Sequence, residues 1–241
     1  AMHRFGPILA QIYGLTESKL DSLVKPLALS AGEKLSFRAH FPDLTLRLTV
    51  IGCDQEEKAF IEHPGEIRRI LGEHVYAEGD ITMEECVGRL FLERRQTLAL
   101  AESCTGGLIS HRITRIAGSS AYYLGGAVTY ANEAKVDFLA VKPATLERHG
   151  AVSEQTALEM SRGIPERTGA SIALSVTGVA GPSGGSVEKP VGTVWMSIAQ
   201  ADRQEAGLFQ FSGDRDRVIL GASQAGLNWL RTALVNEQPT P

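Results

Sequence analysis

A short apolar run that breaks into small polar residues and a glycine pair constrains this fold more than any other feature of the sequence. Residues 97–101 (TLALA) are too few for a helix and are typical of a buried strand. The run leads into ESCT (residues 102–105) and two glycines, and a helical pattern of apolar residues follows. Such a strand-to-helix joint lies at a sheet edge, where ligands bind and helix N–H groups are unpaired. Ser103 and Thr105 can simply cap the helix, or they can belong to a site that holds a nucleophile beside an oxyanion.

The rest of the chain predicts two domains of different character. Residues 80–241 alternate strands with helices and favour a layered α/β/α domain with a mixed sheet. Its strands are expected at about 97–101, 126–130, 171–176, 193–199 and 204–211, the last two as a hairpin. Its helices are expected to begin near Thr82, with Glu85 completing a capping box, and near Leu108, Asn132, Ser153 and Asp214. Residues 1–79 predict a small α+β module with helices at about 16–29 and 54–71 and strands at 35–40, 44–51 and 74–77.

Charge and composition exclude several classes of function. Residues 1–80 contain nine Lys and Arg against twelve Asp and Glu, and the remainder is also slightly acidic, so we expect no nucleic-acid partner. No apolar run is long enough to span a membrane. The three cysteines are scattered, which is typical of reduced thiols and favours a cytoplasmic location. The six histidines are also dispersed, so we expect neither a metal site nor a cofactor.

A second polar segment, VTYANEAK (residues 128–135), combines a tyrosine with a lysine. Tyr130 ends an expected strand, Asn132 is a natural helix cap, and Lys135 falls in the first turn of the next helix. The positive end of a helix dipole lowers the pKa of a lysine, as burial also does. A neutral lysine can take a proton from a serine hydroxyl, although the spacing alone favours an ordinary solvated lysine.

A glycine-rich segment between Gly178 and Thr193 is the third feature. Its composition suits a loop whose backbone amides approach a polar ligand, and it is longer than a plain hairpin requires. The segment is not a Walker loop, because it lacks the Gly-Lys-Ser/Thr ending of that motif. It is not a dinucleotide fingerprint either, because the glycines of that motif would open a helix. A connection without function remains the alternative.

Several segments in order resemble the C-terminal domain of the CinA family, which is named for competence and damage inducibility. The resemblance is carried by ALAESCTGGLIS (99–110), IAGSSAYYLGGAVTYANEAK (116–135), ERHGAVSEQTA (147–157), VTGVAGPSGGSVEKPVGTVW (176–195) and FSGDRDRVI (211–219). IYGLTESKL (12–20) and LSFRAHFP (35–42) resemble the KH-type domain of longer CinA proteins. Those proteins carry a further N-terminal domain similar to molybdopterin-binding proteins, which these 241 residues do not include.

The resemblance implies that nicotinamide mononucleotide, a pyridine nucleotide, is hydrolysed at its carboxamide to nicotinic acid mononucleotide and ammonia, as part of pyridine nucleotide recycling. It assigns the catalytic roles to Ser103, Tyr130 and Lys135, with Tyr130 orienting the lysine or sharing its proton. We expect backbone N–H groups near Thr105 and Gly106 to stabilise the oxyanion. The full set of expected substrate-binding residues is Thr105, Gly106, Gly107, Asn132, Gly178, Gly181, Gly184, Gly185 and Arg215. We also expect a homo-oligomer.

Two alternatives accompany this hypothesis. A catalytically inactive relative would bind the nucleotide as a sensor without releasing ammonia. A nucleic-acid-binding protein would use the KH-like module, although residues 1–80 lack the Gly-x-x-Gly clamp of RNA-binding KH domains. Cys104 is the internal rival of Ser103, and strand alternation predicts that only one of these neighbours faces the site.

Overall fold

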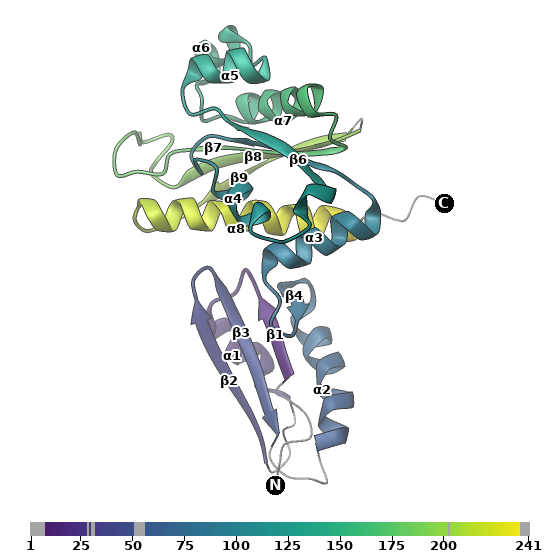
Figure 1. Cartoon of the computed structure of the whole chain (residues 1–241). Coiled ribbons are helices and arrows are strands. Elements are labelled where there is room, and N and C mark those ends of the chain that lie inside the picture. The colour runs from purple at the N-terminus through teal and green to yellow at the C-terminus, as the bar shows by residue number, and fades with distance from the viewer. Residues whose placement is uncertain (1–7, 28, 30–31, 51–55, 202, 237–241) are drawn as a thin grey trace. The chain divides into compact units, whose positions relative to one another are not determined.

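A computed structural model describes residues 8–27, 29, 32–50, 56–201 and 203–236 (Figure 1). The chain separates into two compact units, Ala1–Cys86 and Val87–Pro241, and the division falls within helix α3 (Met83–Arg94). Throughout the described ranges, no helix combines the length and the apolar character that crossing a membrane requires.

The N-terminal unit is an antiparallel four-stranded sheet packed against helices, as the α+β prediction requires. Its strands lie in the order β2-β3-β1-β4. The bounds are β1 Ile8–Ile12, β2 Glu33–His40, β3 Asp43–Val50 and β4 Val75–Glu78, with helices α1 Glu17–Val24 and α2 Glu56–Leu71 and a 3-10 turn Gly72–His74. The alternation in β3 buries Leu44, Leu46 and Leu48 in the core.

Three details of this unit differ from the sequence-based prediction or fall outside it. Strand β1 was not predicted, although it pairs with both β3 and β4. Helix α1 ends at Val24, not near residue 29, and it begins where predicted because the Thr16 hydroxyl accepts a hydrogen bond from Lys19 N–H. The predicted ends at Ile51 and Asp54 lie outside the described residues.

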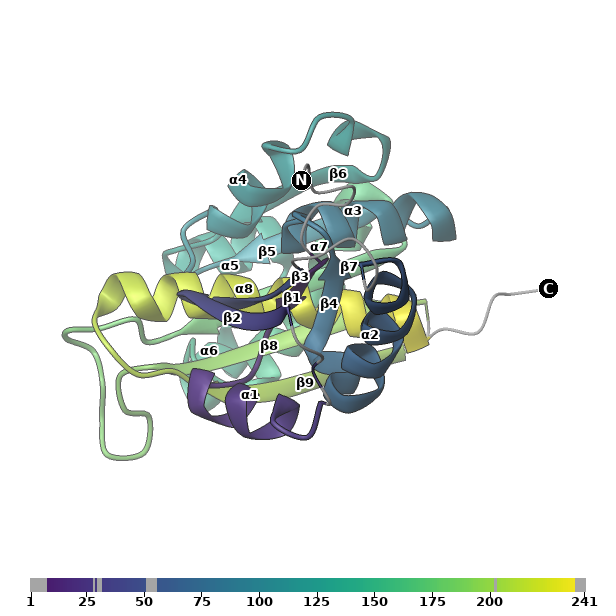
Figure 2. The ribbon, with the colours of Figure 1, turned by 90° about the horizontal axis from the view of Figure 1, so that it is seen from below.

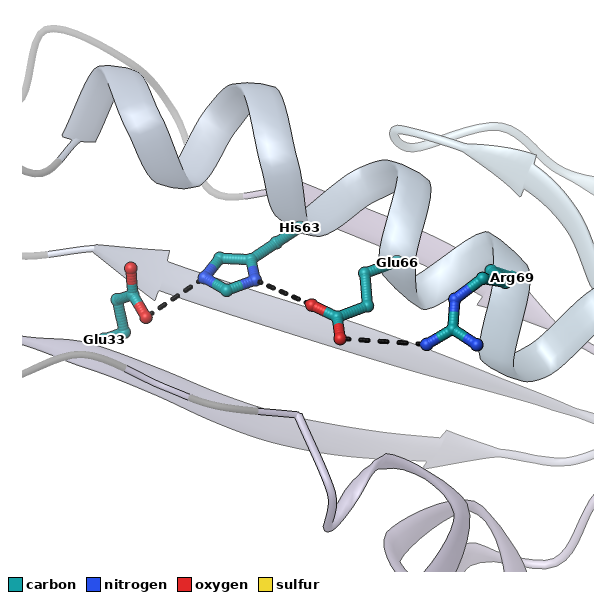
Figure 3. Close-up of polar contacts among 4 residues, drawn as sticks. All are labelled: Glu33, His63, Glu66 and Arg69. Atoms are coloured by element: carbon teal, nitrogen blue, oxygen red, sulfur yellow. Dashed lines mark hydrogen bonds and ion pairs between the residues drawn. The ribbon is translucent and has the colours of Figure 1, made fainter.

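A buried hydrogen bond joins α2 to the edge strand β2 (Figure 3). Nε2 of His63 lies 3.1 Å from Oε2 of Glu33, and their side chains are only 8% and 3% exposed. Nδ1 of His63 also faces Glu66 at 3.8 Å, and Glu66 in turn contacts Arg69. Because buried polar groups are costly unless they are hydrogen-bonded, this contact stabilises the packing of α2 against the sheet.

The C-terminal unit is built on a mixed five-stranded sheet in the order β6-β5-β7-β8-β9. The parallel strands are β5 Leu98–Glu102, β6 Tyr123–Val128 and β7 Ile172–Gly178, and the antiparallel ones are β8 Thr193–Gln200 and β9 Arg203–Gln210. The helices are α4 Leu108–Thr114, α5 Asn132–Leu139, α6 Pro143–His149, α7 Glu154–Thr168 and α8 Arg215–Asn236, with a 3-10 turn Ser119–Ala121. Helices α5, α6 and α7 lie on one side of the sheet and α4 and α8 on the other (Figure 1), which confirms the layered α/β/α prediction.

The local signals that begin the helices are mostly confirmed. Thr82 and Glu85 exchange the two hydrogen bonds of a capping box, and the Ser153 hydroxyl accepts from Thr156 N–H. Asn132 is not the cap of α5: Ala131 occupies that position, and Asn132 is the first helical residue. The polar residue therefore stands one position too late to cap.

Two further elements of this unit differ from the sequence-based prediction. Helix α6 was not predicted, and β6 occupies residues 123–128, not 126–130. The glycine-rich segment is a long loop, as predicted, and it connects β7 to its antiparallel neighbour β8. Figures 1 and 2 both show this loop beyond the end of the sheet, beside the first turn of α8.

Candidate active site

Ser103 and Lys135 come together at the carboxyl edge of the parallel strands. Ser103 follows the last residue of β5, and its N–H donates to the carbonyl of Val176 in the neighbouring β7 at 2.9 Å. Lys135 lies in the first turn of α5, and its Nζ donates to the Ser103 hydroxyl oxygen at 3.0 Å. The two residues are only 7% and 1% exposed. A buried hydroxyl and a buried amine are therefore within proton-transfer distance of each other.

Lys135 is buried among hydrogen-bond acceptors. Among the described residues, the hydrogen-bond partners of its Nζ are the Ser103 hydroxyl and the carbonyl oxygens of Thr129, at 2.7 Å, and Tyr130, at 3.4 Å. Burial lowers the pKa of Lys135, because the charged form loses its hydration there. An uncharged amine of this kind can accept the Ser103 proton.

Tyr130 reaches this site in an unexpected way. Its backbone carbonyl is the part that faces Lys135, while its side chain is 61% exposed. The Tyr130 hydroxyl accepts a hydrogen bond from Nη2 of Arg215 at 2.8 Å, and Nη1 of the same guanidinium donates to Gly181 O at 2.7 Å. Arg215, the first residue of α8, thus links the tyrosine to the glycine-rich loop.

A cavity of about 190 Å³ adjoins the pair. Its lining residues are Ser103, Cys104, Tyr130, Lys135, Ala151, Val152, Thr177, Gly178, Ala180 and Arg215. Sequence reasoning missed Ala151, Val152, Thr177 and Ala180. The position of Thr177, at the carboxyl end of a buried strand, was the available signal. A larger cavity of about 590 Å³ lies near Ser171 and Arg203, at the opposite end of the strands.

Seven expected binding residues do not line this cavity; they are Thr105, Gly106, Gly107, Asn132, Gly181, Gly184 and Gly185. The Gly106 N–H, expected near the oxyanion, donates to the Ser103 carbonyl at 3.0 Å and closes a turn. The carbonyl of Gly181 accepts a hydrogen bond from Arg215. The φ of Gly181, 84°, lies in the left-handed region that favours glycine. Gly184 and Gly185 are exposed in the loop.

The turn after Ser103 still offers donors for an oxyanion. In the described chain, the N–H groups of Cys104 and Thr105 donate to no backbone carbonyl. The Thr105 hydroxyl is buried without a hydrogen-bond partner there. Backbone amides in a turn beside a nucleophile are the donors that stabilise a developing oxyanion.

The position of Cys104 contradicts the prediction that only one of Ser103 and Cys104 faces the site. Cys104 lines the cavity together with Ser103, because β5 ends at Glu102 and strand alternation does not apply to the turn that follows. Burial raises the pKa of the Cys104 thiol to about 12. A protonated thiol is a poor nucleophile, so the chemistry favours Ser103 even though both residues border the cavity.

Comparison with known proteins gives consistent family matches. Residues 80–234 match the family model of the CinA C-terminal domain, and residues 10–77 match that of the damage-inducible protein CinA KH domain. A CinA-like protein from Geotalea daltonii is 44% identical over 228 residues, which are 93% of this chain and 55% of that protein. A putative competence-damage inducible protein from Clostridium perfringens is 40% identical over 94% of this chain and 55% of its own length. The chain thus spans about half the length of these curated relatives.

Solved structures resemble the C-terminal part of the chain. The crystal structure of competence damage-inducible protein A from Klebsiella pneumoniae has a TM-score of 0.63 and 38% identity, covering 65% of this chain and 97% of its own. The structure of a competence/damage inducible protein from Agrobacterium tumefaciens has a TM-score of 0.60 and 40% identity, covering 65% of this chain and 98% of its own.

Proposed function

The chain belongs to the CinA family, and we propose that it hydrolyses the carboxamide of nicotinamide mononucleotide to nicotinic acid mononucleotide and ammonia. The observation that carries this proposal is the 3.0 Å contact between the buried amine of Lys135 and the Ser103 hydroxyl. A serine with a lysine base is chemistry suited to cleaving an amide. The resemblance of the motifs to the nicotinamide mononucleotide deamidase domain supplies the substrate.

In the first step, uncharged Lys135 takes the proton of the Ser103 hydroxyl while Oγ attacks the carboxamide carbon. The N–H groups of Cys104 and Thr105 stabilise the negative charge that develops on the carboxamide oxygen. The tetrahedral intermediate then collapses, the C–N bond breaks, and the Lys135 ammonium gives its proton to the leaving nitrogen, which departs as ammonia. Water hydrolyses the resulting ester of Ser103, and the serine recovers its proton through Lys135.

The charge of the substrate fits this arrangement. A pyridinium ring beside Lys135 disfavours a second positive charge, and so keeps the lysine uncharged. The cavity of about 190 Å³ is small compared with ligand pockets, which are typically about 300–1,000 Å³, so we expect it to hold the ring and its carboxamide alone. Arg215, an exposed residue on the cavity wall, is the candidate partner of the phosphate.

Ammonia release from nicotinamide mononucleotide by the purified chain tests the proposal. We expect turnover by the wild type and its loss in Ser103→Ala and in Lys135→Met. Lys142→Met is the matched control, because Lys142 is exposed and does not line the cavity, and we expect it to retain wild-type turnover. A wild type that binds the nucleotide but releases no ammonia would identify a sensor, and the proposal would be wrong.

A further inference from the structure

Glu102 is a buried carboxylate that the proposed reaction does not use. It is the last residue of β5, directly before Ser103, and only 1% of it is exposed. Its carboxylate accepts three hydrogen bonds from two residues: Ile109 N–H at 3.1 Å, Ser110 N–H at 2.8 Å and the Ser110 hydroxyl at 2.7 Å. Burying a carboxyl group is costly unless it is hydrogen-bonded, so a buried one with three hydrogen bonds directly before Ser103 requires an explanation.

These bonds close a ring around the turn that carries Ser103. Ile109 and Ser110 belong to the first turn of α4, whose N-cap residue Gly107 has no side chain that could cap the helix. Glu102 satisfies two of the N–H groups that a cap would otherwise satisfy. The chain between residues 102 and 109 is thus fixed at both ends, and it contains Ser103 together with the N–H groups of Cys104 and Thr105.

The backbone of Glu102 also fixes the partner of Ser103. Its carbonyl accepts a hydrogen bond from Thr129 N–H at 2.8 Å, where the chain leaves β6. The carbonyl of Thr129 then accepts from Nζ of Lys135 at 2.7 Å. One residue therefore holds the serine turn through its side chain and the lysine contact through its backbone.

We propose that Glu102 is the positioning residue of this site, holding the Ser103 turn in the geometry that attack requires; this inference rests on the proposed function. The three groups that hydrogen-bond to the Glu102 carboxylate in the described chain are all donors. The residue at this position must therefore accept hydrogen bonds through both of its side-chain oxygens. A glutamine in its place would turn an N–H₂ group toward one of these donors and break the ring. Small displacements of a nucleophile reduce turnover far more than they reduce binding.

The structure offers a matched control for this test. The Tyr123 hydroxyl donates to the Ser110 hydroxyl oxygen at 2.8 Å, so it bonds a donor of the ring and not the Glu102 carboxylate itself. Tyr123→Phe removes this outer bond and leaves all three donors of the carboxylate in place. We expect its kcat to stay within about twofold of wild type.

For Glu102→Gln we expect a kcat at least about tenfold lower, with KM within about threefold of wild type, after correction for the folded fraction measured by circular dichroism. A kcat within twofold, or a loss explained entirely by unfolded protein, would overturn the proposal. If Glu102→Gln does not fold, Ser110→Ala removes one of the three donors, and we expect a smaller loss of kcat at unchanged KM. An unchanged kcat in folded Ser110→Ala would then overturn the proposal.

A second readout separates this inference from the proposed substrate. The rate at which a fluorophosphonate labels Ser103, followed by intact mass, reports the reactivity of the serine without any nucleotide. We expect labelling of folded Glu102→Gln to be at least about tenfold slower than that of wild type. If wild type is labelled but releases no ammonia, the substrate is wrong and the positioning role is still tested. Equal labelling rates would reject the positioning role whatever the substrate.

Discussion

Nζ of Lys135 and Oγ of Ser103 lie 3.0 Å apart, although 32 residues separate them in the chain and they belong to different elements. The contact exists because β5 and β6 are parallel neighbours, so the serine turn after one strand meets the helix that follows the other. Lys135 is only 1% exposed, and this burial favours the uncharged amine because the ammonium would lose its hydration. This relationship sets the pH dependence that we expect of the protein.

Activity should rise with pH as Lys135 loses its proton. Burial lowers the pKa of Lys135, so the uncharged base appears at a lower pH than for an ordinary lysine. We expect kcat/KM to increase with pH and to level off before the ordinary lysine pKa of about 10.4 is reached. Measuring kcat/KM between about pH 6 and pH 10 checks this. A profile that falls with pH across this range would argue against a lysine base.

The same residue should make stability pH-dependent. Between the lowered pKa of Lys135 in the folded protein and its ordinary value, the unfolded chain binds a proton that the native state does not. The free energy of unfolding contributed by this residue therefore increases with pH across that window. Urea titrations of wild type and Lys135→Met at several pH values measure the difference. The wild type should gain stability relative to the variant as the pH rises, and an opposite trend would show that the native lysine is charged.

Ser103→Ala should separate chemistry from binding. The hydroxyl acts on the reacting carbon, and a methyl group leaves the cavity open, so we expect turnover to disappear while the Kd for nicotinamide mononucleotide stays within about tenfold of wild type. Isothermal titration calorimetry with the folded variant measures this Kd. A large loss of affinity would instead indicate that Ser103 mainly holds the substrate.

Arg215 should discriminate between substrates with and without a phosphate. We expect Arg215→Met to raise KM for nicotinamide mononucleotide by about tenfold or more, since a charge-assisted hydrogen bond is worth about 1.5–3 kcal/mol. The KM for the riboside, which lacks the phosphate, should change much less. Arg167→Met is the control, because Arg167 is exposed near the end of α7 and does not line the cavity. Equal effects on both substrates would assign Arg215 to holding Tyr130 and the loop.

The sequence predicted those parts of the molecule that depend on local signals. The buried strand before Ser103, the capping box at Thr82 and the cap at Ser153 follow from neighbouring residues, and all three are present. The motif that contains Ser103 and the motif that contains Lys135 could both be identified in the sequence. Their contact could not be predicted from spacing, because it depends on which strands are neighbours in the sheet.

The wrong or missing predictions arise where local sequence preference and the tertiary arrangement disagree. Strand β6 contains Gly125 and Gly126, whose weak strand propensity moved the predicted strand toward residue 130. Strand β1 has only five residues and is held by pairing with residues more than 30 positions away. Ala151 and Val152 carry no chemical signal and reach the cavity only because α6 and α7 meet there. The capping preference of asparagine predicts Asn132 as the N-cap of α5, but Ala131 is the N-cap and Asn132 is the first helical residue.

Cys104 gives the sharpest internal test of the nucleophile, because it borders the same cavity as Ser103. A thiolate would be the better nucleophile, but burial raises the pKa of this thiol to about 12 and keeps it protonated near neutral pH. We therefore expect Cys104→Ala to keep most of its turnover and to lose about 1 kcal/mol of stability from the smaller buried side chain. Ammonia release and urea unfolding measure the two effects. If folded Cys104→Ala were inactive while Ser103→Ala still turned over substrate, the nucleophile would be the thiol.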